Sequence, residues 1–379
     1  MRNLHIYPSL LTHESRILRI TKTLADARIF KEIIIIGIAG NNLPAFEQLD
    51  SVRTFRRVRG IPLEGHRGLL AKALRLSHWS VSVLRSIKDT SVDCVNAHSL
   101  SVLPLCLVIS FWKGARLIYD THELETETSG SGGVRRILAR LVERVCIRYC
   151  RLLFVVSASI ADWYQQQYSA SQPIVIRNIP DDPSNPGDSG IDLRAATSAS
   201  DASVIFLFLG GLIEGRSIAR LLEVFEQCSD QVLVFQGEGR LAGLVDSYAQ
   251  RCPNIFRMKP VPPAQVIGSA KSADVGICLT EPVCLSHEFS LPNKFFEYLF
   301  AGLPVLASRL IELERVVQAF GCGWLASSST DGLTTLVKSL RREEITSKQA
   351  AVRDATRTFS WQNEAERLLT AYRLMLDEK

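Results

Sequence analysis

The sequence predicts an α/β protein built from two Rossmann-like domains, each with a doubly wound parallel sheet. Strand-sized apolar runs alternate with helical stretches, which is the pattern of such sheets. The alternation stops at 181–203, a stretch rich in Pro, Gly, Ser and Asp, and then restarts. The 379 residues are also too many for one ordinary core. We therefore expect domains at 1–180 and 204–360, a linker at 181–203, and a ligand site in a cleft between the domains, beyond the carboxyl ends of the strands.

The first half of the chain contains two helical patterns and five apolar strand patterns. The helices are expected in 14–27 and 134–150, and the strands in 31–40, 92–99, 115–124, 151–159 and 173–180. The strand patterns are short and nearly continuous in apolar residues, as expected for strands covered on both faces.

The second half repeats this alternation after the linker. Strands are expected in 204–211, 231–239, 254–259, 274–280 and 304–308, and helices in 217–227, 241–250, 263–273, 292–301 and 361–376. The last of these belongs to a C-terminal segment, 361–379, that we expect to pack back toward the first domain.

Composition excludes several classes of protein. With 46% hydrophobic and 22% charged residues, the chain is an ordinary globular protein. No apolar run is long enough for a transmembrane helix, and we expect no secretory signal. None of the nine cysteines form a CxxC pair, which favours free thiols in a reducing cytoplasm over zinc or disulfides.

Positive charge is concentrated in the first half, with a net +7 in 51–90 and +5 in 132–153. Leu and Trp are interleaved with the cations in LLAKALRLSHWSVSVLRS, a mixture that suits an anionic membrane surface. A solvated helix face fits the same pattern. We expect no nucleic-acid partner.

Two common nucleotide motifs are absent or incomplete. GIAGNN at 37–42 follows a strand but lacks the GxGxxG spacing of a dinucleotide site, and no GxxxxGK[ST] occurs. A nicotinamide or P-loop enzyme is therefore disfavoured.

The second domain has glycine turns that suit a diphosphate. In FLGGLIEGRS, Gly210 and Gly211 end a strand and Arg216 starts the next helix. Glycines let the backbone approach a ligand, and helix amides with a guanidinium bind phosphate. Gly237 and Glu238 form a second turn after a strand. The alternative for Arg216 is an ordinary surface arginine, and the alternative for the turn at Gly237 and Glu238 is a tight turn without a ligand.

The stretch SLPNKFFEYLFAGLPVLAS at 290–308 predicts an apolar helix with one polar stripe. Asn293, Lys294 and Glu297 share a face of this helix, which begins after Pro292 and ends at Gly302. We expect Lys294 to bind phosphate and Glu297 to accept hydrogen bonds from two ribose hydroxyls. The alternative is a simple ion pair between Lys294 and Glu297 on an exposed face.

This stretch resembles the donor-binding signature of retaining glycosyltransferases with the GT-B fold, in the large "glycosyl transferases group 1" family. HESRILRITKTL, VNAHS, IYDTHEL, FVVSASIADWY and VIRNIP resemble segments of the family's first domain, and FLGGLIEGRSIARLLEVF and LVFQGEGR resemble its phosphate loops. The resemblance extends over about the whole chain. It implies two domains facing across a cleft.

The resemblance also implies an activity. The family moves a sugar from a nucleoside diphosphate sugar to a glycan or lipid-linked acceptor, with retention of anomeric configuration and no cofactor. We expect a role in cell-surface polysaccharide or lipopolysaccharide biosynthesis, in the cytoplasm and peripheral at the inner face of the membrane.

The chain departs from the family pattern at two positions. Eight residues before Glu297 the family often has a carboxylate that holds the transferred sugar, and this chain has Phe289. Either Glu288 takes the role through a one-residue shift, or backbone groups of Phe289, Ser290 and Leu291 contact the sugar, or the sugar contact differs.

The second departure concerns cations. The family's frequent Arg after the first phosphate-loop glycine is Gly211 here. This leaves Arg216 and Lys294 to stabilise the leaving diphosphate, which we expect them to do without a metal. No DxD pair ends a strand, and Asp181 and Asp182 lie in the linker.

Histidines follow two strands of the first domain. By resemblance, His122 in YDTHEL contacts the transferred sugar or positions the acceptor, and His98 and Glu123 are acceptor-side candidates. The alternative for both histidines is a structural role.

Two other functions fit the same architecture. A nucleotide-sugar 2-epimerase would be expected to have more acid and base groups in the cleft than the sequence offers. A catalytically silent subunit that regulates a transferase is the non-enzyme alternative, and retention of Arg216, Lys294 and Glu297 argues against it.

Overall fold

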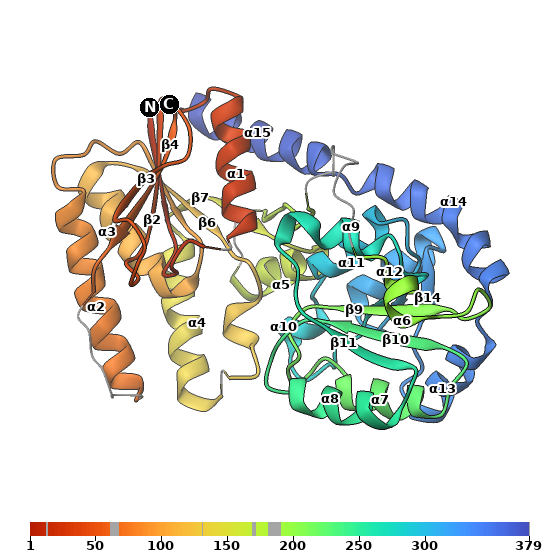
Figure 1. Cartoon of the computed structure of the whole chain (residues 1–379). Helices are drawn as coiled ribbons and strands as arrows, with labels where there is room; N and C mark the ends of the chain where they lie inside the picture. Colours follow the sequence, from red (N-terminus) through yellow and green to blue (C-terminus); the bar gives the residue numbers. More distant parts are fainter. Residues whose placement is uncertain (13, 61–67, 131, 169–171, 181–190, 379) are drawn as a thin grey trace. The chain divides into compact units, whose positions relative to one another are not determined.

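The computed structural model describes residues 1–12, 14–60, 68–130, 132–168, 172–180 and 191–378, which form two compact units (Figure 1). Unit 1 comprises Met1–Arg177 and Glu364–Lys379, and unit 2 comprises Asn178–Asn363. Each unit has its own largely parallel sheet, so the predicted class, α/β with two parallel-sheet domains, is confirmed. The predicted cleft between the domains stays a prediction. Residues 181–190 of the expected linker, with Asp181 and Asp182, lie outside the described residues.

Unit 1 is built on an eight-stranded sheet with the order β3-β4-β2-β1-β5-β6-β7-β8, parallel except for β3 against β4. Its strands are β1 (Arg2–Ile6), β2 (Glu32–Ile38), β3 (Phe46–Gln48), β4 (Arg53–Val58), β5 (Cys94–Ala97), β6 (Arg116–Asp120), β7 (Cys150–Val155) and β8 (Ile174–Val175). Its helices are α1 (Ser15–Asp26), α2 (Leu69–Ser86), α3 (Leu103–Lys113), α4 (Gly133–Ile147), α5 (Ala158–Tyr168) and most of α15 (Trp361–Asp377).

The C-terminal helix α15 completes the core of unit 1. Tyr372 is fully buried, with its ring 5.9 Å from the rings of both Phe30 and Phe154. At the start of the helix, Glu364 accepts hydrogen bonds from the backbone and the guanidinium of Arg177, each at 3.0 Å. Because Arg177 ends the first segment of unit 1, this carboxylate ties the two segments of the unit together.

Unit 2 has a six-stranded parallel sheet with the order β11-β10-β9-β12-β13-β14. Its strands are β9 (Ile205–Leu209), β10 (Val232–Gln236), β11 (Ile255–Met258), β12 (Val275–Cys278), β13 (Val305–Ala307) and β14 (Gly323–Leu325). Its helices are α6 (Leu193–Thr197), α7 (Ile218–Glu226), α8 (Ala242–Arg251), α9 (Val266–Ala270), α10 (Leu285–Glu288), α11 (Asn293–Phe300), α12 (Ile311–Phe320), α13 (Thr330–Ser339) and α14 (Arg342–Thr358).

The side chains of β9 point alternately to the two sides of the sheet, so the core of unit 2 has two layers. Leu207 and Leu209 point into a cluster with α11, α12 and α14, whereas Phe206 and Phe208 point into a cluster with α7, α8 and α13. Successive strand side chains face opposite sides of a sheet, so helices cover both faces. Leu193 of α6 is buried in the first cluster, which makes the described part of the expected linker a packed portion of unit 2.

Helix α11 has a defined start and end. Pro292 lies at its N-cap, and Gly302 follows its C-cap with φ +83°. The amide of Gly302 donates to the Leu299 carbonyl and that of Leu303 to the Tyr298 carbonyl, which is a Schellman motif. The predicted glycine stop is therefore confirmed.

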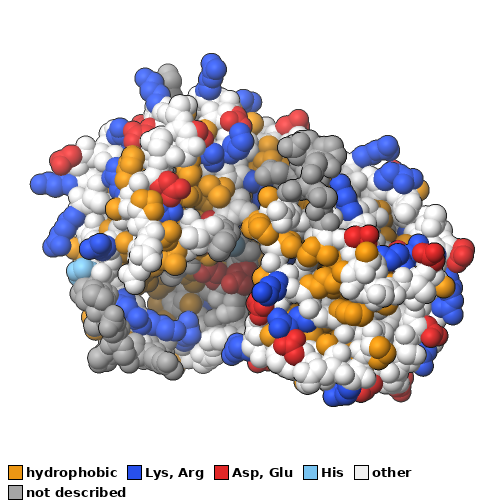
Figure 2. Space-filling view, viewed as in Figure 1, with side chains coloured by type: hydrophobic (Ala, Val, Ile, Leu, Met, Phe, Trp, Pro, Cys, Tyr) orange, Lys and Arg blue, Asp and Glu red, His pale blue; other side chains and the backbone are white. Residues whose placement is uncertain are grey.

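The surface of unit 1 differs from our expectation for 51–90. Figure 2 shows Lys and Arg side chains along the outline of this unit, at the left. However, Trp79 is 2% exposed and donates from Nε1 to the Val58 carbonyl, and Arg57 is buried against Glu47. The expectation that the Trp of LLAKALRLSHWSVSVLRS, Trp79, helps to form a membrane surface is wrong, because its side chain packs inside the unit, and Arg57 does not add its charge to the exposed surface of 51–90. No helix among the described residues is long and apolar enough to span a bilayer.

Candidate functional site

Two glycine turns of unit 2 pack directly against each other. The first follows β9 at Gly210, whose φ is +124°, and the second follows β10 at Gly237. A Cβ on Gly237 would lie 1.8 Å from the Gly210 carbonyl oxygen, and one on Gly239 would lie 2.3 Å from that of Leu212. We expected glycine at these positions so that the backbone could approach a ligand closely. The structure shows a second reason, because the two turns approach each other so closely that a side chain at Gly237 or Gly239 would collide with the other turn.

Two adjoining cavities open beside these turns. The larger, of about 300 Å³, is lined by Leu209, Gly210, Gly211, Gln236, Gly237, Glu238, Pro260, Val261, Val266 and Lys294. The smaller, of about 170 Å³, shares the residues of the first turn and Lys294, and adds Arg216, Thr280 and Asn293 among others. The structure thus brings together the predicted residues Gly210, Gly211, Arg216, Gly237, Glu238 and Lys294.

Arg216 reaches the smaller cavity from the loop before α7. Its Nη1 donates to Thr280 Oγ1 at 2.9 Å, which fixes the guanidinium beside β12. The backbone amide of Ser217 donates to Glu281 Oε1 at 3.1 Å. The backbone amide of the N-cap residue is therefore already occupied by a carboxylate, and Arg216 joins Lys294 as a cation lining this cavity.

The polar stripe of α11 forms one connected group. Lys294 Nζ lies 2.7 Å from Glu297 Oε2, and Asn293 Nδ2 donates to Glu297 Oε1 at 3.2 Å. Glu297 is 8% exposed and lines neither of the two described cavities, whereas Lys294 lines both. The ion pair that we weighed as an alternative is present, but its carboxylate is buried, and it holds the ammonium at the cavities.

The segment before α11 is largely engaged within the chain. Phe289 and Ser290 donate their backbone N–H groups to the carbonyls of Leu285 and His287. Leu291 is buried in the core of unit 2. In the described structure, Phe289, Ser290 and Leu291 do not line either cavity. Their contact with a sugar stays a prediction.

Sequence reasoning missed Gln236, at the end of β10. Its side chain is 2% exposed, its Oε1 accepts from Ser269 Oγ at 3.0 Å, and its Nε2 has no hydrogen-bond partner. An unpartnered buried amide costs free energy unless something binds it. Gln236 also lines the larger cavity, so this unpartnered amide lies in the wall of the candidate site. The only sequence signal was one polar residue closing an apolar strand.

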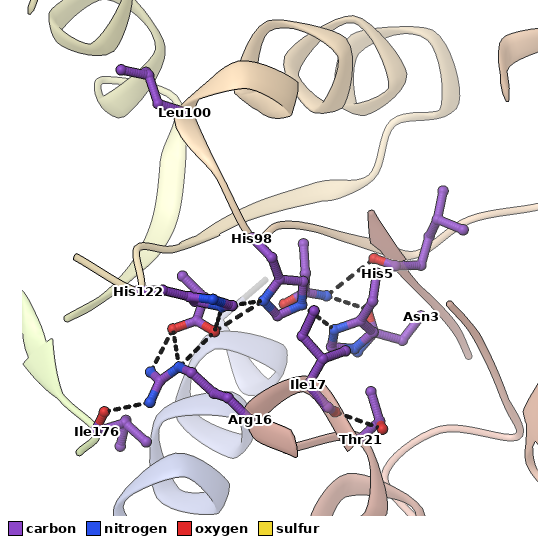
Figure 3. A network of polar contacts seen from close by, with 12 residues as sticks. Asn3, His5, Arg16, Ile17, Thr21, His98, Leu100, His122 and Ile176 are labelled. Atoms are coloured by element: carbon purple, nitrogen blue, oxygen red, sulfur yellow. Dashed lines mark hydrogen bonds and ion pairs between the residues drawn. The ribbon is translucent and has the colours of Figure 1, made fainter. Parts of the chain in front are cut away.

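A second polar cluster lies in unit 1 at the ends of β5 and β6 (Figure 3). Asp120 Oδ2 lies 3.0 Å from His98 Nδ1 and 3.3 Å from His122 Nε2, and Asp120 Oδ1 lies 2.6 Å from Arg16 Nη2. His98 and Asp120 are buried, and His122 is partly exposed. The structure therefore brings the two predicted histidines together around a carboxylate that we had not singled out, although it lies two residues before His122.

This cluster continues inward across the central strands. His98 Nε2 lies 2.8 Å from Nδ1 of His5 on β1, and His5 Nε2 lies 3.0 Å from Asn3 Nδ2. Burial lowers the pKa of His98 and holds that of His5 well below its ordinary value. Burial alone would raise the pKa of Asp120, but Arg16 and the two histidines outweigh it and hold that pKa well below its ordinary value. The carboxylate therefore stays charged beside the His98 imidazole, which resists protonation.

One ligand atom from each of His98, Asp120 and His122 falls within 4.8 Å of the others, a spacing that a metal ion could use. Arg16 already neutralises Asp120, and His98 uses both ring nitrogens for hydrogen bonds. The network is thus complete for these two residues without a metal, and the expected metal independence stays a prediction.

The remaining acceptor-side candidate, Glu123, is exposed, and its carbonyl accepts a hydrogen bond from Thr121 Oγ1. Its neighbour Glu125 accepts from the Leu100 amide and from Ser99 Oγ, both at 2.8 Å. Burial raises the pKa of Glu125 to about 7. Glu125 is a titratable group that sequence reasoning did not single out.

Comparisons with known proteins identify the fold of this chain by its structure and not by its sequence. No family model and no curated protein matches the sequence. Among solved structures, the chain resembles a sucrose-phosphate synthase from Thermosynechococcus elongatus, with 14% identity, all of both chains covered and a TM-score of 0.80. It also resembles HepE from Anabaena in complex with UDP-glucose, with 14% identity, 98% and 99% coverage and a TM-score of 0.72.

A third similar structure is the lipopolysaccharide outer core galactosyltransferase WaaB, with 13% identity, 98% and 99% coverage and a TM-score of 0.68. At these identities the likeness establishes the fold. The chain therefore has the fold of the GT-B glycosyltransferases.

Proposed function

We propose that this protein is a retaining glycosyltransferase that moves a sugar from a nucleoside diphosphate sugar to a glycan or lipid-linked acceptor. The observation that carries the proposal is the position of Lys294. It lies in the first turn of α11, lines both cavities, and stands beside the glycine turn at Gly210, where a diphosphate would find a cation and open backbone. UDP and UDP-glucose, which HepE binds, are the first nucleotides to try.

In the proposed reaction the bond between the sugar C1 and the diphosphate oxygen breaks, and a bond from C1 to an acceptor hydroxyl forms on the same face. The transition state is oxocarbenium-like, and negative charge grows on the leaving phosphate. Arg216 and Lys294 would stabilise that charge, and the leaving phosphate would take the acceptor proton. His122 would contact the transferred sugar or the acceptor from unit 1.

Glu297 has a double role in this proposal. Its two oxygens already accept from Lys294 and Asn293, but a carboxylate has about four acceptor positions. It can therefore orient the ammonium and still accept from ribose hydroxyls.

Calorimetric titration of UDP, GDP and ADP tests the nucleotide site. Changing Arg216, Lys294 or Glu297 to Ala should weaken binding of the preferred nucleotide by about 1–3 kcal/mol each, the value of a hydrogen bond to a charged group. Arg251→Ala is the matched control, because Arg251 pairs with Glu226 on the exposed surface of the same unit. Unchanged affinity in all three site variants would refute the assignment.

Incubation of candidate nucleotide sugars with and without acceptor separates the alternatives. A transferase releases the nucleoside diphosphate and forms a glycoside of unchanged anomeric configuration, an epimerase converts the sugar, and a silent subunit does neither.

We further propose that the enzyme works in the cytoplasm on the inner membrane face, in cell-surface polysaccharide or lipopolysaccharide assembly, because the basic surplus lies in unit 1.

A further inference from the structure

Helix α4 of unit 1 turns its apolar side outward. The exposed residues Val134, Ile137, Leu138, Leu141, Val142 and Val145 recur at spacings of three and one, so they form a single stripe along the helix, the α4 stripe. The exposed fractions reach 71% at Val134 and 67% at Ile137. A helix on a globular protein normally buries such a stripe.

The opposite, polar side of α4 explains this orientation. Glu143 is fully buried and accepts hydrogen bonds from the hydroxyls of Tyr119, Tyr164 and Tyr168 at 3.0, 2.6 and 2.8 Å. Arg140, on the same side, donates to Glu127 at 2.7 Å. These contacts hold the helix with its carboxylate inward, and turning the stripe inward would break all of them.

Helix α3 extends the apolar surface. Its residues Val108, Phe111 and Trp112 are exposed, and the ring of Phe111 lies 5.1 Å from that of Tyr149, just beyond α4. The α4 stripe spans about 16 Å along the helix axis. The combined α3–α4 face thus has aliphatic side chains along α4 and aromatic rings on α3 and at Tyr149.

The charged side chains that 103–113 and 132–151 expose on this face are all positive. Arg135, Arg144, Arg148 and Arg151 are exposed, and Lys113 Nζ lies 4.1 Å from the ring centroid of Trp112. In 103–113 and 132–151 the only acidic residue is Glu143, which is buried. An apolar strip flanked by arginines complements a bilayer surface with anionic head groups and accessible acyl chains. It does not complement a second copy of itself, because the same cations would then face one another.

We propose that the α3–α4 face docks the protein on anionic lipid bilayers. Ile137, Leu141 and Trp112 enter the head-group boundary, and the flanking arginines bind lipid phosphates. This inference deepens the membrane association proposed above and rests on it, but it does not depend on the transferase activity. The proposed membrane-docking surface is therefore the α3–α4 face and not residues 51–90, where we first expected such a surface.

The test is cosedimentation with phosphatidylcholine vesicles that contain or lack phosphatidylglycerol. Wild-type protein should bind the anionic vesicles, and binding should fall as salt rises. The double variant Ile137→Glu with Leu141→Glu should bind at least about tenfold more weakly, because it puts two charges into the apolar contact. Leu74→Glu on α2 is the matched control, since Leu74 and Leu141 are both 56% exposed. It should bind as wild type.

Each other outcome decides against the proposal. Absence of wild-type binding at low salt, or equal loss in Leu74→Glu and the double variant, overturns the assignment. A dimer in light scattering that Leu141→Glu dissociates would show that the face joins two copies of the chain. Circular dichroism and urea unfolding verify that the variants fold. Nucleotide binding is measured separately, so a failed transferase proposal and a failed docking proposal give different results.

Discussion

Tyr298 links the helix that bears Lys294 to the strand that leads into the first glycine turn. Its hydroxyl accepts a hydrogen bond of 2.7 Å from the Leu209 amide, at the last residue of β9. Tyr298 is fully buried, and burial raises its pKa well above the ordinary value, so the hydroxyl keeps its proton. Tyr298→Phe retains the ring, which packs against Gly276 of β12, and removes only the acceptor.

The expected cost follows from that single lost contact. Because the ring stays, no large cavity forms, and the loss is that of a partner for a buried backbone N–H. Such a loss costs about 1–3 kcal/mol. Amide hydrogen exchange at Leu209 should therefore become about 5- to 150-fold faster. Nucleotide affinity should also fall, since Leu209 lines both cavities.

Hydrogen exchange with mass spectrometry on a peptide spanning 205–212 measures the first effect, and urea unfolding gives the change in the free energy of unfolding. Tyr149→Phe is the control, because Tyr149 is exposed, and its effect should stay within about 0.5 kcal/mol. If Tyr298→Phe and Tyr149→Phe leave exchange at 205–212 equally unchanged, the hydroxyl does not hold this strand end, and the reasoning is wrong.

Three further predictions concern other parts of the molecule. Gly237→Ala should abolish nucleotide binding in calorimetry and destabilise unit 2, because its Cβ would collide with the Gly210 carbonyl oxygen. Burial raises the pKa of Glu125 to about 7 from 4.5, so its contribution to stability is present below pH 4.5 and is lost as pH rises through 7. The free energy of unfolding should fall across that window by up to about 1.4 kcal/mol per pH unit, and less steeply in Glu125→Gln. Transfer activity should survive EDTA, and a loss restored by Mg²⁺ or Mn²⁺ would place a metal in the mechanism.

Much of unit 2 could be predicted from sequence because its signals are local. The strands of 204–211 and 231–239 are apolar runs that end in glycine, and the Pro292 and Gly302 boundaries of α11 follow from backbone preference. The pairing of Lys294 with Glu297 also follows from helical spacing.

The missed features depend on residues far apart in the sequence. We did not predict β1, because Arg2, Asn3 and His5 interrupt its apolar character, yet it is a central strand and its histidine contacts His98. Arg2 pairs with Glu32 of the neighbouring strand, a partner that no local pattern reveals.

Helix α4 shows the same limit. Its existence was predictable from periodicity, but its orientation was not, because the amphipathic rule would bury the stripe instead of Glu143. The deciding partners are tyrosines of β6 and α5, more than 20 residues away in either direction. Tertiary hydrogen bonds outweighed the local pattern here.

The carboxylate of Glu364 that ties together the two segments of unit 1 bears on how the chain folds during synthesis. Unit 2 is complete when residue 363 has been made, whereas unit 1 still lacks Tyr372 and the rest of α15. Domains of most chains finish in order from the N-terminus. In this protein the first unit to begin is the last to finish, and a chain cut short before Tyr372 contains every residue of unit 2 but leaves the core of unit 1 open.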